Sequence, residues 1–310
     1  MEHVEVKGAV AAARRNQRHR LQHLWSFEGP LLWLLPAIIM LAMFSIFPLL
    51  FNLINSFREF NPISKAFEPA GLTNWAKLFQ DPRMWNALRI TFVFTLAGLL
   101  IEFVLGFSVA LLFDRDPWGV GVLQTLFILP MVTPPAIAGR MFQLLEHSEF
   151  GAISWILYSV GVLTPAEPLL GGTGKYALIG VLIAEIWQWT PFFGLILLAG
   201  LKALPHEPLE AAQVDGATAL QRFWHVKLPL MRSVIAVAVL FRLIDLYKTF
   251  DYVFILTGGG PGEATTTLSY YMYRYYESIR WGYMSALGVF ILFIVWVSAF
   301  LYTKLFRVQW

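Results

Sequence analysis

The chain has 310 residues, of which 57% are hydrophobic and only 14% are charged. An average soluble domain carries about 25% charged residues, so this composition excludes a soluble globular protein and predicts a membrane protein. The net charge of +3 is small and most basic residues flank apolar runs, which sets nucleic-acid binding aside. The absence of cysteine excludes disulfide frameworks and thiolate metal sites.

Six apolar runs are long enough to cross a bilayer, which requires about 20 residues. They cover approximately residues 31–57, 88–113, 118–145, 176–201, 233–257 and 282–306. The first run exceeds the apolar core of a signal peptide, so we expect it to remain as a helix. The predicted fold is all-α, with a polar tail at residues 1–29 and one transmembrane domain at residues 30–310.

Basic residues indicate the orientation. Arg14, Arg15, Arg18 and Arg20 cluster before the first run, and an arrangement with the N-terminus inside also places the majority of Lys and Arg inside. Six spans would then put both termini in the cytoplasm, together with residues 205–230.

The first loop, residues 58–87, is expected to lie outside. Asn74 is positioned to cap a short surface helix, and Trp75 and Trp85 are suited to the lipid headgroup level.

The second outer loop, residues 146–175, contains a sequence similar to a phosphate-binding loop, PLLGGTGKY. Leu169 stands where the first glycine is required, and Tyr176 replaces the hydroxyl residue that binds magnesium. The interpretation is an outer turn, and the chain shows no ATP site of its own.

Prolines interrupt the third run at Pro130, Pro134 and Pro135. Such breaks free backbone groups that lipid cannot satisfy, so they are expected to face protein or a water-filled cavity. A packed kink is the alternative.

Residues 205–230 form the main polar segment between apolar runs. Pro205 and Pro208 favour a helix start, and Gly216 favours a stop, since glycine accepts a left-handed cap. Thr218 and Gln221 match a capping box for a second helix. That helix is expected to run to Lys227 and to end at Pro229.

Seven ionisable residues fall inside the predicted spans. Each costs about 2.5–3.5 kcal/mol at the bilayer centre, so they should face one another or a cavity. The seven are Glu102, Arg140, Glu185, Arg242, Asp245, Lys248 and Asp251.

Three of these charges belong to two polar helix faces on the spans that flank residues 205–230. One face carries Glu185, Gln188, Trp189 and Phe192, and the other carries Arg242, Asp245 and Thr249. An acid, an amide and aromatic rings suit a polyhydroxylated ligand. The alternative is an internal Arg242–Asp245 ion pair with Trp189 as packing.

After the fifth run, glycines and a proline at residues 258–262 stop the helix. The aromatic run that follows is typical of an interfacial helix.

Several motifs together resemble the permease subunits of binding-protein-dependent ABC importers of the carbohydrate type, such as the maltose and glycerol-phosphate permeases. These are LPxxxPP at 129–135, WxWTPF at 187–192, the "EAA" pattern at 210–230, and RLID with FD at 242–251. A serine, Ser233, stands where the family often has a proline, and we expect little consequence.

The resemblance implies a type I importer fold with a cytoplasmic coupling helix, in a bacterial cytoplasmic membrane. It implies that the EAA-type loop docks into a groove of an ATPase subunit through Glu210, Ala211, Ala212, Asp215, Gly216, Phe223 and Pro229. The substrate path would be lined by Glu185, Gln188, Trp189, Phe192, Arg242, Asp245 and Thr249. The outer face at Gly258, Gly259, Gly260 and Pro261 would meet a substrate-binding protein.

The implied partners are a second permease subunit, two ABC ATPases that bind ATP and Mg, an extracytoplasmic binding protein, a carbohydrate-type substrate and the bilayer. No catalytic residue, cofactor or metal is expected in this chain. An ATP-independent secondary transporter or channel is one alternative. An intramembrane hydrolase is another, although no histidine lies inside a predicted span and Asp245 and Asp251 lean to opposite faces.

Overall fold

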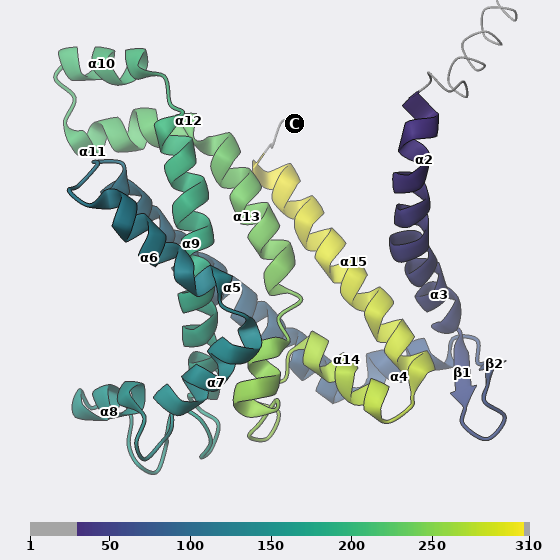
Figure 1. Ribbon diagram of the computed structural model, residues 1–310. Helices are drawn as coiled ribbons and strands as arrows, with labels where there is room; N and C mark the ends of the chain where they lie inside the picture. The colour runs from purple at the N-terminus through teal and green to yellow at the C-terminus, as the bar shows by residue number, and fades with distance from the viewer. Residues whose placement is uncertain (1–29, 307–310) are drawn as a thin grey trace, which may run out of the picture. The chain divides into compact units, whose positions relative to one another are not determined.

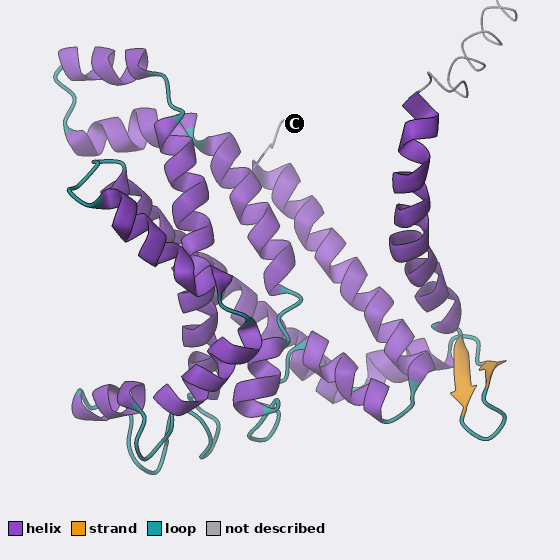
Figure 2. Ribbon diagram, viewed as in Figure 1, coloured by secondary structure: helices purple, strands orange, loops and turns teal. Residues whose placement is uncertain are grey.

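The computed structural model describes residues 30–306, and helices dominate it (Figures 1 and 2). The arginine cluster of the N-terminal tail lies outside the described residues. The chain divides into two compact units, residues 1–55 and residues 56–310, which we treat separately.

The first unit contains one continuous helical stretch. It runs through α2 (Pro30–Leu41), a π-helical turn η1 (Ala42–Ile46) and α3 (Phe47–Asn55). Its most apolar window, within Trp33–Asn55, buries none of its residues. This agrees with the first predicted span.

The second unit begins with a hairpin of β1 (Arg58–Asn61) and β2 (Ala66–Pro69), which pair antiparallel with Arg58 opposite Pro69. Helix α4 (Thr73–Gln80) follows. The prediction that Asn74 caps it is wrong, because the N-cap residue of α4 is Leu72, which makes no side-chain capping bond, and Asn74 lies inside the helix. Instead Asn74 is buried and donates to the carbonyls of Ser56 and Arg58, at 3.2 and 2.8 Å, which fixes α4 against the hairpin.

Helix α5 (Pro82–Phe113) has 32 residues and begins earlier than the apolar run predicts. Asp81 caps it, since its carboxylate accepts from the Arg83 N–H at 3.0 Å, and Pro82 occupies the first turn, where no N–H is needed. Asp81 and Pro82 thus start the helix before the apolar run, which begins at residue 88.

The third run forms two helices, α6 (Val120–Val132) and α7 (Pro135–Leu145), which meet at 96°. Residues 118–145 are therefore not one straight span. The bend lies at Thr133–Pro134, and Gln188 donates to the freed Thr133 carbonyl at 2.7 Å. The break thus faces protein, as the prolines predict.

The next segment contains a short helix, α8 (Ala152–Ser159), followed by turns. The lysine of its phosphate-loop-like sequence, Lys175, pairs with Glu167 at 3.2 Å.

Helices α9 (Ala177–Lys202) and α15 (Trp281–Phe306) match the fourth and sixth predicted spans. Helix α9 packs closely along α5, because Gly106 of α5 lies against Phe193 and Gly194 without room for a side chain. The fifth run is divided into α13 (Arg232–Leu246) and a π-helical turn η3 (Val253–Thr257). Among the described residues, four helices are long and apolar enough to cross a membrane, or five if the bent pair counts as one span. The number six stays a prediction.

Residues 205–230, the coupling segment, form α10 (His206–Val214), α11 (Ala219–Arg222), η2 (Phe223–Lys227) and α12 (Leu228–Leu230). The predicted break at Gly216 is present, with φ of +80°, and so is the capping box of Thr218 and Gln221. Pro229 does not end the helix, contrary to the prediction. The wide turn η2 precedes it, and Pro229 occupies the first turn of α12, where its missing N–H is tolerated.

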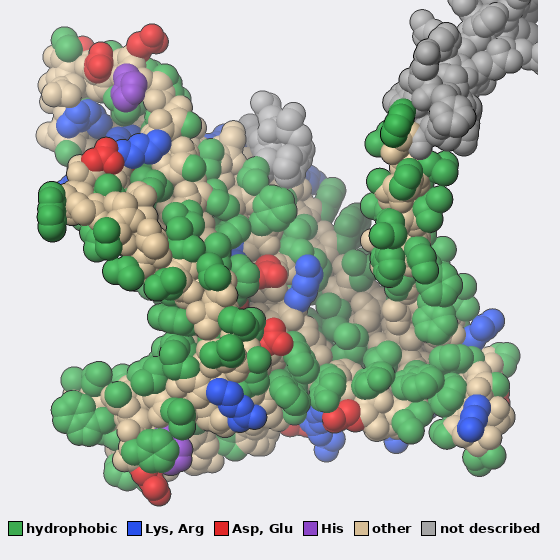
Figure 3. All heavy atoms as spheres, viewed as in Figure 1, with side chains coloured by type: hydrophobic (Ala, Val, Ile, Leu, Met, Phe, Trp, Pro, Cys, Tyr) green, Lys and Arg blue, Asp and Glu red, His purple; other side chains and the backbone are tan. Residues whose placement is uncertain are grey.

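The coupling segment lies at one end of the second unit, called here the coupling end (Figure 1). The opposite, distal end carries α8, the loop 258–262 and α14 (Leu268–Glu277). Between the ends, hydrophobic side chains cover the helices, and a few acidic and basic side chains gather midway (Figure 3).

Candidate functional site: a polar cavity between the helices that flank the coupling segment

A cavity of about 230 Å³ lies between α9 and the segment that follows α13. Five of the seven predicted path residues line it, namely Glu185, Gln188, Trp189, Asp245 and Thr249. The lining also includes Pro135, Lys248, Phe250, Asp251 and Tyr252. The helical spacing used to predict the two polar faces thus selected residues that line one cavity in the fold.

Arg242 lies behind the wall of this cavity and is 1% exposed. Its Nε donates to Glu102 Oε2 at 2.6 Å, and its Nη2 donates to Glu102 Oε1 at 2.8 Å and to Glu185 Oε1 at 2.5 Å. Its Nη1 donates to Asp245 Oδ2 at 2.5 Å, so the predicted alternative of an Arg242–Asp245 ion pair is present. One arginine therefore joins α5, α9 and α13.

The Trp189 ring covers the Arg242 guanidinium, at 4.7 Å from the ring centroid. Stacking of this kind stabilises a desolvated cation. Trp189 thus contributes both to the cavity wall and to the burial of the ion cluster.

The Gln188 amide is hydrogen-bonded through both its oxygen and its nitrogen. It accepts from the Tyr252 hydroxyl at 2.6 Å and donates to the Thr133 carbonyl at 2.7 Å. Phe192 does not line the cavity, because its ring packs edge-on against Phe193, with centroids 5.7 Å apart, on the side of the core that surrounds Phe107.

The predicted path residues omit several that the structure brings to the site: Glu102, Lys248, Asp251 and Tyr252. Helical spacing relates residues within one helix, whereas Glu102 comes from α5 and Asp251 follows the break after α13. The sequence did indicate Glu102 as a single acidic residue within an apolar run, but it did not indicate its partner.

The coupling segment presents a second surface. Phe223 packs on Phe107 of α5, with centroids 5.6 Å apart, and Lys227 pairs with Asp114 at 2.8 Å. The other side is free: Glu210, Ala211, Asp215 and Gly216 are exposed, and the Val214 side chain is 87% exposed. The segment is thus tied to α5 on one side and open on the other.

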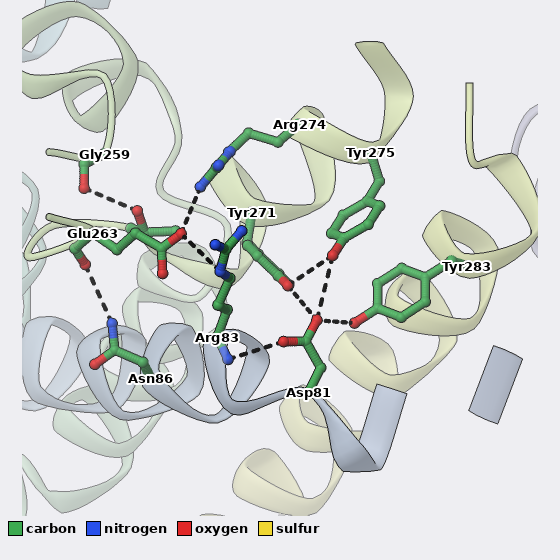
Figure 4. Close-up of polar contacts among 10 residues, drawn as sticks. Asp81, Arg83, Asn86, Gly259, Glu263, Tyr271, Arg274, Tyr275 and Tyr283 are labelled. Atoms are coloured by element: carbon green, nitrogen blue, oxygen red, sulfur yellow. Dashed lines mark hydrogen bonds and ion pairs between the residues drawn. The ribbon is translucent and has the colours of Figure 1, made fainter. Parts of the chain in front are cut away.

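The loop 258–262 at the distal end is held by polar contacts (Figure 4). Glu263, which follows it, pairs with Arg274 at 2.9 Å and with Arg83 at 3.7 Å. Gly259 is buried against Tyr270, and its carbonyl accepts from the Thr266 hydroxyl at 2.9 Å, whereas Gly258 is exposed.

Asp81, at the start of α5, accepts from three tyrosines: Tyr271 at 2.5 Å, Tyr283 at 2.9 Å and Tyr275 at 3.3 Å (Figure 4). Burial raises the pKa of Asp81, but these hydrogen bonds together hold it below its usual value. The ionised carboxylate therefore fixes α14 and α15 to the start of α5.

Several helices of membrane-spanning length, a polar cavity between α9 and the segment that follows α13, and an exposed helical segment that joins α9 to α13 define a multi-pass membrane transport subunit. The family described as "Binding-protein-dependent transport system inner membrane component" matches residues 102–308, and the chain belongs to this family.

Relatives support the same assignment. The chain is 36% identical to the trehalose/maltose transport system permease protein MalF of Thermococcus litoralis over 76% of this chain and 79% of that protein. It is 33% identical to the trehalose transport system permease protein SugA of Mycobacterium tuberculosis over 99% and 96%. It is 30% identical to the sn-glycerol-3-phosphate transport system permease protein UgpA of Agrobacterium fabrum over 86% and 90%.

The fold is similar to that of a solved bacterial ABC transporter involved in the import of the acidic polysaccharide alginate. The TM-score is 0.76 at 22% identity, over 94% of this chain and 98% of the other. The type I ABC importer permease fold expected from the sequence is thereby confirmed.

Proposed function

We propose that this chain is a permease subunit of an ATP-driven importer, and that it forms the path of a sugar or related polyhydroxylated solute together with a second permease subunit. The names of the relatives support a sugar-type cargo. The observation that carries the proposal is that α9 and α13, which line the polar cavity, are the two helices that the coupling segment joins.

In this proposal the energy comes from two partner ATPases that bind ATP and Mg, and this chain holds no ATP site. The exposed side of the coupling segment, at Glu210 to Gly216, docks on one of them. ATP-driven closure of the ATPases moves the segment, and α9 and α13 turn with it so that the cavity opens alternately to each side.

An extracytoplasmic binding protein delivers the solute at the distal end, where Gly258 and the partly exposed Gly260 and Pro261 are the contact points on the loop. Buried Gly259 holds the shape of this loop. The coupling end and both termini face the cytoplasm.

The test uses the complete complex with its ATPases and binding protein in proteoliposomes. We expect Glu210→Lys to abolish ATP-dependent uptake of labelled trehalose or maltose while the complex still assembles, since it reverses the charge of a docking residue. Glu149→Lys serves as the control and should retain uptake. It makes the same charge reversal at an exposed residue between α7 and α8, at the distal end.

Two results would contradict the proposal. Uptake at the parent rate in Glu210→Lys would refute docking through this segment. Uptake that persists without ATP hydrolysis would favour the alternative, a secondary transporter.

A further inference from the structure

The cavity between α9 and α13 is acidic. Three carboxyl groups line it, from Glu185, Asp245 and Asp251, and Lys248 is its one cation among the described residues. Behind the wall, Arg242 and Glu102 add one charge of each sign. Four carboxyl groups thus accompany two cations, and protonation of one carboxyl still leaves a negative excess.

Arg242 is unavailable to a solute. Its three nitrogens all donate to carboxylates, and the Trp189 ring covers its plane. A guanidinium recognises a phosphate or carboxylate by directing two parallel N–H groups at it, and here the Glu102 carboxylate occupies that position with two bonds of 2.6 and 2.8 Å. The group best suited to bind an anion is already neutralised within the protein.

The accessible carboxylates have the opposite chemistry. The Asp245 side chain is 48% exposed and Asp251 is exposed, so both can accept hydrogen bonds from hydroxyl or ammonium groups. An anion in the same cavity would meet their charge at short range, where the local dielectric is lower than in water and repulsion is strong.

We propose that this cavity admits uncharged or amino-bearing polyhydroxylated solutes and excludes sugar phosphates and uronates, with Asp245 and Asp251 as the residues that determine this selectivity. The proposal rests on the proposed function and narrows its cargo. Lys248 moderates the acidic charge but does not reverse it.

The absence of cysteine in this chain permits a direct test. Thr249→Cys places a thiol on the cavity lining. In the purified complete complex, three methanethiosulfonate reagents of similar size would be compared: neutral hydroxyethyl, cationic trimethylammonium-ethyl and anionic sulfonatoethyl. The rate is read from the mass of this subunit, so cysteines in partner subunits do not interfere.

The control is Ser159→Cys, an exposed position at the end of α8. After normalisation to this control, we expect the neutral and cationic reagents to modify Thr249→Cys at least tenfold faster than the anionic reagent. Adding Asp245→Asn or Asp251→Asn should reduce that ratio about threefold, and adding Lys248→Gln should increase it.

Equal normalised rates, or a faster anionic reagent, would overturn the inference, as would no reaction with any reagent, because the cavity would then be closed to solutes. If neither Asp245→Asn nor Asp251→Asn changes the ratio of reagent rates, these two residues do not determine the selectivity. The rates require no transport. Retained sugar uptake with equal rates therefore refutes only the inference, whereas the expected rates without ATP-dependent uptake refute only the proposed function.

Discussion

At the scale of single residues, Glu146 stands apart from the charges of the cavity. It follows α7, is fully buried, and neither of its carboxyl oxygens has a hydrogen-bond partner among the described residues. The carboxyl lies against Gly180 of α9, where a side chain would collide with it. Burial raises the pKa of Glu146 from 4.5 to about 8.

This burial predicts a pH dependence. The folded protein retains the Glu146 proton between pH 4.5 and about 8 whereas the unfolded chain has lost it, so the contribution of this group to stability falls as pH rises through that range. We expect Glu146→Gln to raise the thermal unfolding temperature at pH 9 and to change it little at pH 5, because the amide resembles the neutral carboxyl.

Thermal unfolding of the purified complex at the two pH values measures this difference. Glu149→Gln, at an exposed position three residues away, is the control and should behave like the parent. A variant that loses stability equally at both pH values would show that the neutral carboxyl is not what the site holds.

Sequence reasoning finds isolated residues of this kind more readily than their partners. Glu185 and Asp245 were identifiable because a charge in an apolar run is costly. The threefold engagement of Arg242 was not, since Glu102 is 140 positions from it along the chain and only the packing of α5 brings them together.

At the scale of elements, the coupling segment depends on the left-handed backbone of Gly216. Its φ is +80°, and no atom lies within 4 Å of the position that a Cβ would take. A β-branched residue there meets backbone strain of about 1–2 kcal/mol but no collision. We expect Gly216→Val to shift α10 relative to α11 and to lower solute uptake per ATP hydrolysed, with the complex still assembled.

Gly161 provides a matched control, because its φ is +75° and it too has open space around it, in the turn after α8. Gly161→Val carries the same local strain at the distal end and should retain normal coupling. Equal losses in the two variants would mean that strain alone, and not the geometry of the coupling segment, causes the effect.

Elements with local signals were predictable, and breaks with remote partners were not. The capping box and the glycine stop lie within a few residues of the helices that they define. By contrast, the break after α13 is stabilised by hydroxyls from the start of α14: Ser269 donates to the Tyr247 carbonyl at 3.2 Å, and Thr267, the N-cap residue of α14, donates to the Thr249 carbonyl at 3.0 Å. Hydropathy over residues 233–257 contains no such information, and the same applies to Gln188 at the α6–α7 bend.

At the scale of the whole molecule, the ion cluster links three helices of the second unit. Arg242 bridges α5, α9 and α13, and Lys227 and Phe223 bind the coupling segment to α5. In the proposed transport cycle, we therefore expect a displacement of the segment to move these three helices together.

Arg242→Lys tests this transmission. Lysine keeps the charge but cannot form the bidentate bond to Glu102 or stack on Trp189 in the same way. We expect the complex to assemble and hydrolyse ATP while transporting several-fold less solute per ATP. Arg232→Lys, at an exposed position on the same helix, is the control. Unchanged stoichiometry in Arg242→Lys would show that the helices move together without the cluster.

The helical stretch of the first unit bears on how the chain is made. Its backbone groups are satisfied along its own length, and its most apolar window contains no buried residue. A segment of this kind is stable in lipid by itself, before any partner helix exists. Such a segment can therefore hold the chain at the bilayer before the ion cluster and the coupling segment, which follow it in the sequence, have formed.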